Sequence, residues 1–232
     1  MTALPSQSPR ALLLAYALPY LLYVGLGVIF DPQTQPLALY GARAVGVGAA
    51  LVWASRSWLH IRGPRGIAGS LALGAAAGLA GTALWIALVA PGARADAVAW
   101  GESAWLARAV VATALPPLVE EPLMRGFVLP LALLWQRARR AGARQPLAEA
   151  MERGSLGAIA PGEWSVLAVG VSSAVFAAGH APEEWLAAFA YGLLMCAVWI
   201  ARGDLVSCIS AHAVTNAALA VYVRETGNWA LW

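Results

Sequence analysis

The sequence predicts an all-α fold: a polytopic membrane helix bundle of seven or eight helices with an intramembrane polar site. Of its 232 residues, 60% are hydrophobic and only 12% are charged, whereas a soluble domain is about half apolar and a quarter charged. Apolar runs of the length that crosses a bilayer, about 20 residues, also alternate with short polar turns. We therefore expect residues 1–232 to form a single integral membrane domain, with a motif-bearing core at about residues 116–223.

The first half of the chain predicts three spans. Residues 11–30 form the first. A cleaved signal peptide is the rival interpretation, but no small-x-small cleavage site precedes Asp31 and the run exceeds a usual signal core. After a polar turn, residues 37–58 form the second span, with Arg43 near one end, where its side chain can snorkel to the interface.

Residues 67–90 form the third span, and their small residues indicate how it packs. Gly74, Gly78 and Gly81 recur at the spacing that lets two helices approach backbone to backbone. We expect a packing helix without chemistry of its own.

Two prolines predict a helix start in the middle of the chain. Residues 102–115 form a shorter segment, which Pro116 and Pro117 interrupt. Because proline is favoured in the first turn of a helix and disfavoured further in, we expect a new helix from here to about Trp135. The carboxylates that follow would then lie in its opening turns, where the helix dipole favours negative charge.

The second half predicts an arginine-rich polar stretch and three more spans. Within this stretch, which ends at about Gly162, residues 145–153 can form a short interfacial helix. The further spans are residues 164–179, 185–201 and 205–223. No period of 20–50 residues recurs, so an internally repeated transporter is not indicated.

The charges indicate topology and not nucleic-acid binding. The net charge of +3 comes from arginines scattered along loops, with no lysine in the chain. Loop arginines place residues 56–65 and 137–153 in the cytoplasm, and we expect a prokaryotic plasma (inner) membrane. Following the helices, Glu120 and His180 both lie toward the non-cytoplasmic side. Cys196 and Cys208 have apolar neighbours and no CxxC spacing, so they are expected to be small core residues.

Six polar residues stand out within the apolar segments. Glu120, Glu121 and Arg125 lie within six positions, although one charge at the centre of a spanning helix costs about 2.5–3.5 kcal/mol. Glu121 and Arg125 are four residues apart, as are His212 and Asn216, so each pair shares a helix face. His180 lies at the end of another span.

These residues carry a resemblance to a known family. Glu120-Glu121-x-x-x-Arg125, Phe176-x-x-x-His180 and His212-x-x-x-Asn216, in this order on separate helices, resemble the CPBP family of intramembrane glutamic endopeptidases. That family includes the type II CAAX prenyl proteases and bacterial bacteriocin-processing or immunity proteins. The resemblance covers about residues 120–216, and the first 100 residues match only in being hydrophobic.

The resemblance implies a role for each residue. Glu120 would be the general base that activates water, and His180 would hold that water or shuttle its proton. His212 and Asn216 would stabilise the oxyanion of the tetrahedral intermediate. Glu121 and Arg125 would support the site as an ion pair. No cofactor or metal is implied, and the expected partners are a membrane-anchored or lipid-modified peptide or protein substrate and the lipid bilayer.

Elementary chemistry agrees with these roles. Peptide hydrolysis needs a base whose pKa lies near the working pH, and donors placed where the oxyanion forms. A glutamate, two histidines and an asparagine supply both without a serine or cysteine.

Blander interpretations stay open. The histidines and Asn216 can simply bond neighbouring helices, and the glutamates can form a structural network with Arg125. His60, in a basic loop, is expected to be solvated. Glu183 and Glu184 are expected to cap the helix before Trp185, although they could line an entrance to the site.

Two other functions also remain. A zinc protease could use a glutamate and two histidines, although HExxH is absent and asparagine is a poor zinc ligand. A non-catalytic protein, such as a proton-coupled carrier or an immunity or scaffolding factor, could use the same residues as a relay.

Overall fold

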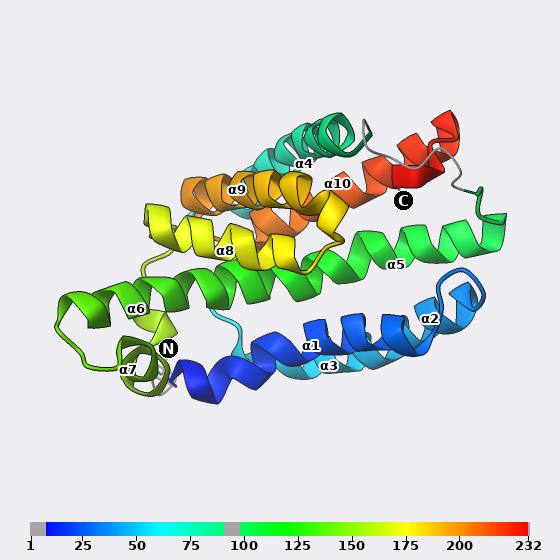
Figure 1. Ribbon diagram of the computed structural model, residues 1–232. Helices are drawn as coiled ribbons and strands as arrows, with labels where there is room; N and C mark the ends of the chain where they lie inside the picture. Colours follow the sequence, from blue (N-terminus) through cyan, green and yellow to red (C-terminus); the bar gives the residue numbers. More distant parts are fainter. Residues whose placement is uncertain (1–7, 91–97, 232) are drawn as a thin grey trace.

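The computed structural model describes residues 8–90 and 98–231, and within these ranges the regular structure is entirely helical (Figure 1). The α-helices are α1 (Pro9–Ile29), α2 (Pro36–Ala42), α3 (Gly48–Ala54), α4 (Ile67–Val89), α5 (Glu102–Glu121), α6 (Leu129–Arg140), α7 (Pro146–Arg153), α8 (Val166–Ala178), α9 (Trp185–Arg202) and α10 (Leu205–Thr226). Two π-helical segments, η1 (Arg43–Val47) and η4 (Pro122–Val128), join α2 to α3 and α5 to α6.

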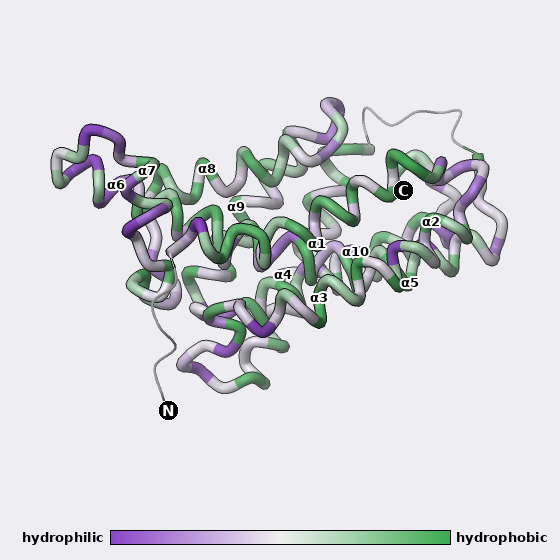
Figure 2. The backbone as a smooth tube through the Cα atoms, turned by 90° about the horizontal axis from the view of Figure 1, so that it is seen from below, coloured by the Kyte–Doolittle hydropathy of each residue, from purple (hydrophilic) through white to green (hydrophobic). Residues whose placement is uncertain are grey.

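The predicted fold class is confirmed. Counted over the described ranges, helices that continue without a break form eight segments, and five of these are long and apolar enough to cross a membrane. Figure 2 shows apolar residues along the helices and hydrophilic ones gathered at the turns, most clearly around α6 and α7. Large apolar side chains also face outward, among them Leu21, Val52 and Leu186, as expected for helices surrounded by lipid.

The prediction that a helix begins at Pro116 is wrong. Both prolines lie inside α5, which begins at Glu102. Pro116 has no N–H to donate to the carbonyl four residues earlier, that of Ala112. Instead, the side-chain amide of Asn216 on α10 donates to this carbonyl, with a Nδ2 to O distance of 2.8 Å. A neighbouring helix therefore satisfies the acceptor that the proline left unpaired, as membrane helices allow.

The carboxylates consequently lie in the middle of a long helical segment, so the dipole argument does not apply to them. At about 1.5 Å per residue, the segment from Glu102 to Arg140 is roughly 58 Å long, about twice the thickness of the hydrocarbon core. Its α6 end carries Arg137, Arg139 and Arg140.

The π-helical segment η4 begins at another proline, Pro122. Proline cannot make the regular bond to the preceding turn and collides with its carbonyl, and a wider turn relieves both problems. At the end of the segment, the N–H of Leu129 bonds to the carbonyl of Met124, five residues earlier, which also accepts from the Ser172 hydroxyl of α8 at 3.1 Å. This wide turn holds Arg125, which is fully buried.

The predicted glycine packing of the third span is confirmed. A Cβ placed on Gly78 would lie 2.5 Å from the carbonyl oxygen of Ala211 and 2.7 Å from Cβ of Val214. The backbones of α4 and α10 therefore touch, and the Thr215 hydroxyl donates to the Gly78 carbonyl at 2.9 Å. This contact fixes the position of α10 along α4, and with it the positions of His212 and Asn216.

Of the remaining predicted segments and residues, some agree with the structure and some do not. The span expected at residues 164–179 is the 13-residue helix α8, which is shorter than a full crossing. The short helix expected at residues 145–153 is present as α7, and both cysteines are free and buried. His60 is not simply solvated, because its ring packs edge-on against Trp199, with 6.2 Å between ring centroids, and its carbonyl accepts from the N–H of Leu205.

The arginine-rich turns gather at one end of the bundle. In Figure 1, the α3–α4 connection and the α6–α7 region lie at one end, whereas the α1–α2 turn and the C-terminus lie at the other. The charge pattern of the loops therefore matches a real separation in space.

Candidate active site

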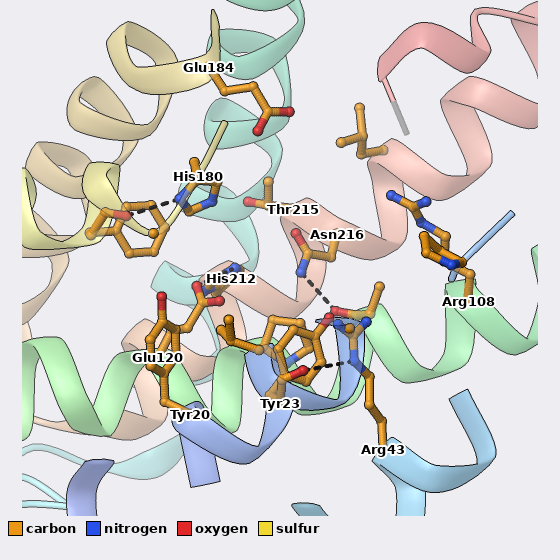
Figure 3. Close-up of a pocket in the computed structure, with 18 of the residues that line it drawn as sticks. Tyr20, Tyr23, Arg43, Arg108, Glu120, His180, Glu184, His212, Thr215 and Asn216 are labelled. Carbon is orange, nitrogen blue, oxygen red and sulfur yellow. Dashed lines mark hydrogen bonds and ion pairs between the residues drawn. The ribbon is translucent and has the colours of Figure 1, made fainter. Parts of the chain in front are cut away.

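One cavity of about 400 Å³ brings the four predicted catalytic residues together (Figure 3). Glu120 comes from the middle of α5, His180 from just beyond the end of α8, and His212 and Asn216 from adjacent turns of α10. The remaining walls come from α1, the α2–η1 region, α4 and α9. Residues separated by nearly 100 positions thus line one cavity.

Glu121, Arg125 and His212 form a buried network beside this cavity. Oε2 of Glu121 lies 3.1 Å from Nη1 of Arg125, and both side chains are 0% exposed. Oε1 of Glu121 lies 2.9 Å from Nδ1 of His212 and accepts a hydrogen bond from it. Arg125 also donates from Nη2 to the carbonyl of Gly192 on α9, at 2.8 Å. Glu121 therefore contacts α10 through His212 and η4 through Arg125, and Arg125 links it to α9.

Glu120 has a different environment although it is the neighbouring residue. Its side chain is 12% exposed, lines the cavity and lies 4.0 Å, measured from Oε2, from Nε2 of His212. That distance is too long for a direct hydrogen bond and leaves the carboxylate available to a small molecule in the cavity. His212 therefore stands between the two glutamates, bonded to one and near the other.

His180 is held by its own chain. Its Nδ1 lies 3.0 Å from the carbonyl oxygen of Phe176, so a proton on Nδ1 is used there and Nε2 is the nitrogen left for other partners. Its ring packs against Phe176 and Trp85, with centroids at 4.8 and 5.6 Å. Trp185 donates to the His180 carbonyl at 3.1 Å, which fixes the turn that carries the imidazole.

Asn216 uses one amide proton for the carbonyl of Ala112. The amide nitrogen carries two protons, so a second one remains for a group in the cavity. Asn216 thus contacts α5 and also lines the cavity.

Comparison with protein families identifies the chain. The model of the family "Type II CAAX prenyl endopeptidase Rce1-like" matches residues 102–218, from the start of α5 to the last turns of α10. This chain belongs to the Rce1-like family. Neither the curated proteins nor the solved structures contain a match. The resemblance inferred from the motifs is confirmed, and the chain is an integral membrane protease of the CAAX type that acts on a peptide substrate in a lipid environment.

This Rce1-like protease has cavity residues that the sequence analysis missed. Arg43, expected to snorkel, lines the cavity, as do Arg108 and three tyrosines, Tyr20, Tyr23 and Tyr40. Of the two glutamates after α8, Glu184 lines the cavity. An arginine eight positions into an apolar helix was an available clue to the role of Arg43, but helix packing decides which way such a side chain turns.

Tyr191 of α9 is a further member of the site. Its ring lies 5.5 Å from that of His212 and its hydroxyl donates to Thr215 at 3.0 Å. Thr215 is in turn bonded to the backbone carbonyls of Gly78 and Ala211. The wall behind His212 is therefore braced by α4 and α9.

A metal site needs several donor side chains around one point. Among the described residues, no group of three or more His, Cys, Asp or Glu side chains is arranged to hold one. Nδ1 of His212 bonds Glu121, so Nε2 is the ring nitrogen nearer to Glu120 and the cavity.

Proposed function

We propose that this membrane protease cleaves a peptide bond of a membrane-associated substrate with a water molecule activated by Glu120. One observation carries the proposal: the Glu120 carboxylate faces a cavity that it shares with His180, His212 and Asn216, and lies 4.0 Å from Nε2 of His212.

The other groups around the cavity favour water over a protein nucleophile. No serine or cysteine belongs to the described residues that line it. The Thr215 hydroxyl accepts from Tyr191 and lies within hydrogen-bond distance of two backbone carbonyls, so it has no base to activate it. An acyl-enzyme route would need an activated hydroxyl or thiol, whereas direct attack by water needs only the carboxylate.

The position of His212 between two carboxylates supports a donor role for it. Its Nδ1 donates to Oε1 of Glu121, and its Nε2 lies 4.0 Å from Oε2 of Glu120 at the cavity wall. A proton on Nε2 would point into the cavity, where an oxyanion would form.

The proposed reaction follows from these positions. Glu120 takes a proton from water as the water oxygen attacks the carbonyl carbon. The N–H groups of His212 and Asn216 stabilise the resulting oxyanion. When the intermediate collapses, the carbonyl re-forms, the C–N bond breaks, and the leaving amine takes up the proton that Glu120 removed from water. Nε2 of His180, which is fixed through Nδ1, would relay this proton, and Glu120 returns to its ionised form. Glu121 and Arg125 hold His212 in place and do not touch the substrate.

The position of the cavity supports a substrate from the non-cytoplasmic leaflet. Its walls include Pro32, in the α1–α2 turn, and Leu231, near the C-terminus, and both lie at the end away from the arginine-rich turns (Figure 1). The positive-inside rule places the arginine-rich end in the cytoplasm. A lipid-modified or C-terminally anchored export signal in a prokaryotic plasma membrane fits this orientation.

A cleavage assay tests the mechanism. Purified protein in lipid nanodiscs, in which both membrane faces are accessible, is incubated with an S-farnesylated Cys-Val-Ile-Met peptide, a lipid-modified C-terminal peptide of the class that the family name describes. Products are identified by mass spectrometry. Glu120→Gln should lower kcat/KM by about 100- to 10,000-fold, the usual contribution of a general base. Full activity in this variant would refute the proposal. Loss of wild-type activity on chelation, restored by zinc, would favour a metalloprotease instead.

A further inference from the structure

Arg43 is a cation built into the wall of the cavity. It lies in the π-helical segment η1, seven residues or roughly 10 Å along the helix from Pro36, within a segment apolar enough to span the membrane. A charge at such a depth is expensive unless it faces a polar partner or a cavity. Its side chain is half-buried and lines the cavity that holds Glu120.

Contacts with α1 hold the guanidinium in position. Nε donates to the carbonyl of Tyr23 at 3.0 Å, and Cζ lies 3.9 Å above the centre of the Tyr23 ring. A Cβ on Gly27 would lie only 2.6 Å from Nη2 of Arg43, so the absence of a side chain at position 27 makes room for the guanidinium. The group is therefore seated on a surface that fits it and is oriented before any ligand arrives.

These contacts leave much of the guanidinium's donor capacity unused. Its five N–H groups form a planar fork that matches a carboxylate, and the contact to Tyr23 uses one of them. Among the described residues, no carboxylate forms an ion pair with Arg43. The wall in contact with the cavity thus offers a fixed cation suited to an incoming anion.

The cation and the hydrolytic groups occupy different ends of the cavity. Figure 3 shows Arg43 and Arg108 on the side away from Glu120 and His180, with Asn216 between them. Arg108, whose Cζ lies 4.7 Å from the Trp100 ring centre, adds positive potential at that end. A cavity of about 400 Å³ lies in the lower part of the range for ligand sites and suits a short peptide segment.

We propose that Arg43 binds the C-terminal carboxylate of the peptide substrate and so sets which bond lies at Glu120. The inference rests on the proposed function. A C-terminal carboxylate is the one anion that every peptide of this kind carries whatever its side chains. Anchored at Arg43, the chain would extend past Asn216 toward Glu120, so that a bond near the C-terminus meets the activated water.

Binding measurements test this without relying on cleavage. The full chain carrying Glu120→Gln, in phosphatidylcholine nanodiscs, is titrated with two forms of the S-farnesylated Cys-Val-Ile-Met peptide, one with a free carboxylate and one with a C-terminal amide. The carboxylate form should bind about 10- to 100-fold more tightly, the usual range for a hydrogen bond to a charged group. Adding Arg43→Gln should remove this difference by weakening only the carboxylate form. Arg43→Lys should retain part of it, and Arg153→Gln, at an exposed ion pair on α7, should leave it unchanged.

Other results overturn the assignment. Equal affinity for the two peptides in the Arg43-containing protein, including no measurable binding of either, refutes it. Equal weakening of both peptides by Arg43→Gln indicates a packing role for the arginine. If the effect of the variant depends instead on added phosphatidylglycerol and not on the peptide terminus, the anion is a lipid phosphate. Cleavage by wild type and Glu120→Gln is followed separately, so a failed glutamate mechanism and a failed carboxylate site give different results.

Discussion

The same conservative substitution, glutamate to glutamine, should affect protein stability differently at the two adjacent positions Glu120 and Glu121. Glutamine in place of Glu120 keeps the size of the side chain at a partly exposed position without an ion pair shorter than 4.0 Å. The fold should tolerate it, while peptide cleavage is lost. Glutamine in place of Glu121 removes a charge that compensates Arg125 at 3.1 Å, where both side chains are 0% exposed.

The magnitude for Glu121→Gln follows from this burial. Removing one partner of a buried ion pair typically lowers the free energy of unfolding by about 3–5 kcal/mol, because the other charge stays buried and uncompensated. Glutamine can still accept from Nδ1 of His212 through its one oxygen, but it carries no charge to compensate Arg125. We therefore expect a loss of about 3 kcal/mol, which corresponds to a fall in Tm of about 6–12 °C for a chain of this size.

Thermal unfolding in nanodiscs, followed by the fluorescence of the 11 tryptophans, measures both variants. Glu120→Gln should lower the Tm less than Glu121→Gln does, since its carboxylate lies 4.0 Å from Nε2 of His212 and its side chain is 12% exposed. Adding Arg125→Met to Glu121→Gln should recover part of the loss, because replacing both members of a buried pair by uncharged residues is often close to neutral. An unchanged Tm for Glu121→Gln, or an equal fall for Glu120→Gln, would show that the two carboxylates do not have separate roles.

Three further predictions concern packing, pH and topology. Gly78→Val should destabilise the protein by at least about 1–3 kcal/mol, since its Cβ would overlap the α10 backbone. Gly25→Ala serves as the control, because nothing lies within 4 Å of the added Cβ. Equal Tm values for the two variants would contradict the close α4–α10 contact. Burial lowers the pKa of His60, in the α3–α4 loop, from its usual value of 6.5, and a hydrogen bond with the backbone of Ile159 partly opposes this shift. The folded protein therefore favours the neutral imidazole, and its stability should fall as the pH drops below about 6.5. His60→Asn, which tolerates the positive φ of this position, should flatten the fall in Tm between about pH 7.5 and about pH 5.5, and an unchanged slope would assign the pH dependence elsewhere. Cysteines introduced at the exposed positions Gln33 and Glu183 should react with impermeant reagents from the non-cytoplasmic side; labelling of either from the cytoplasm would reverse the orientation.

The sequence by itself determined the fold class, most of the spans and four of the polar residues that share the cavity. Apolar runs long enough for a bilayer have few structural choices, because only helices or closed barrels satisfy the backbone in lipid. The glycines at positions 74, 78 and 81 predicted a close helix contact because their spacing is a property of one helix. The four-residue spacing of Glu121 and Arg125 likewise predicted their shared face before any partner was known.

Only the tertiary structure decided features that depend on a second helix. Pro116 should have begun a helix, but Asn216, 100 residues later, supplies the donor that lets α5 continue through it. Neighbouring residues on a helix point about 100° apart, so the position of α10 determines that Glu121 bonds His212 and that Glu120 faces the cavity. Arg43 could have pointed to the interface, and the space above Gly27 on α1 is what turns it inward. In each case the local sequence sets which groups a helix carries, and contacts between helices set which of those groups meet.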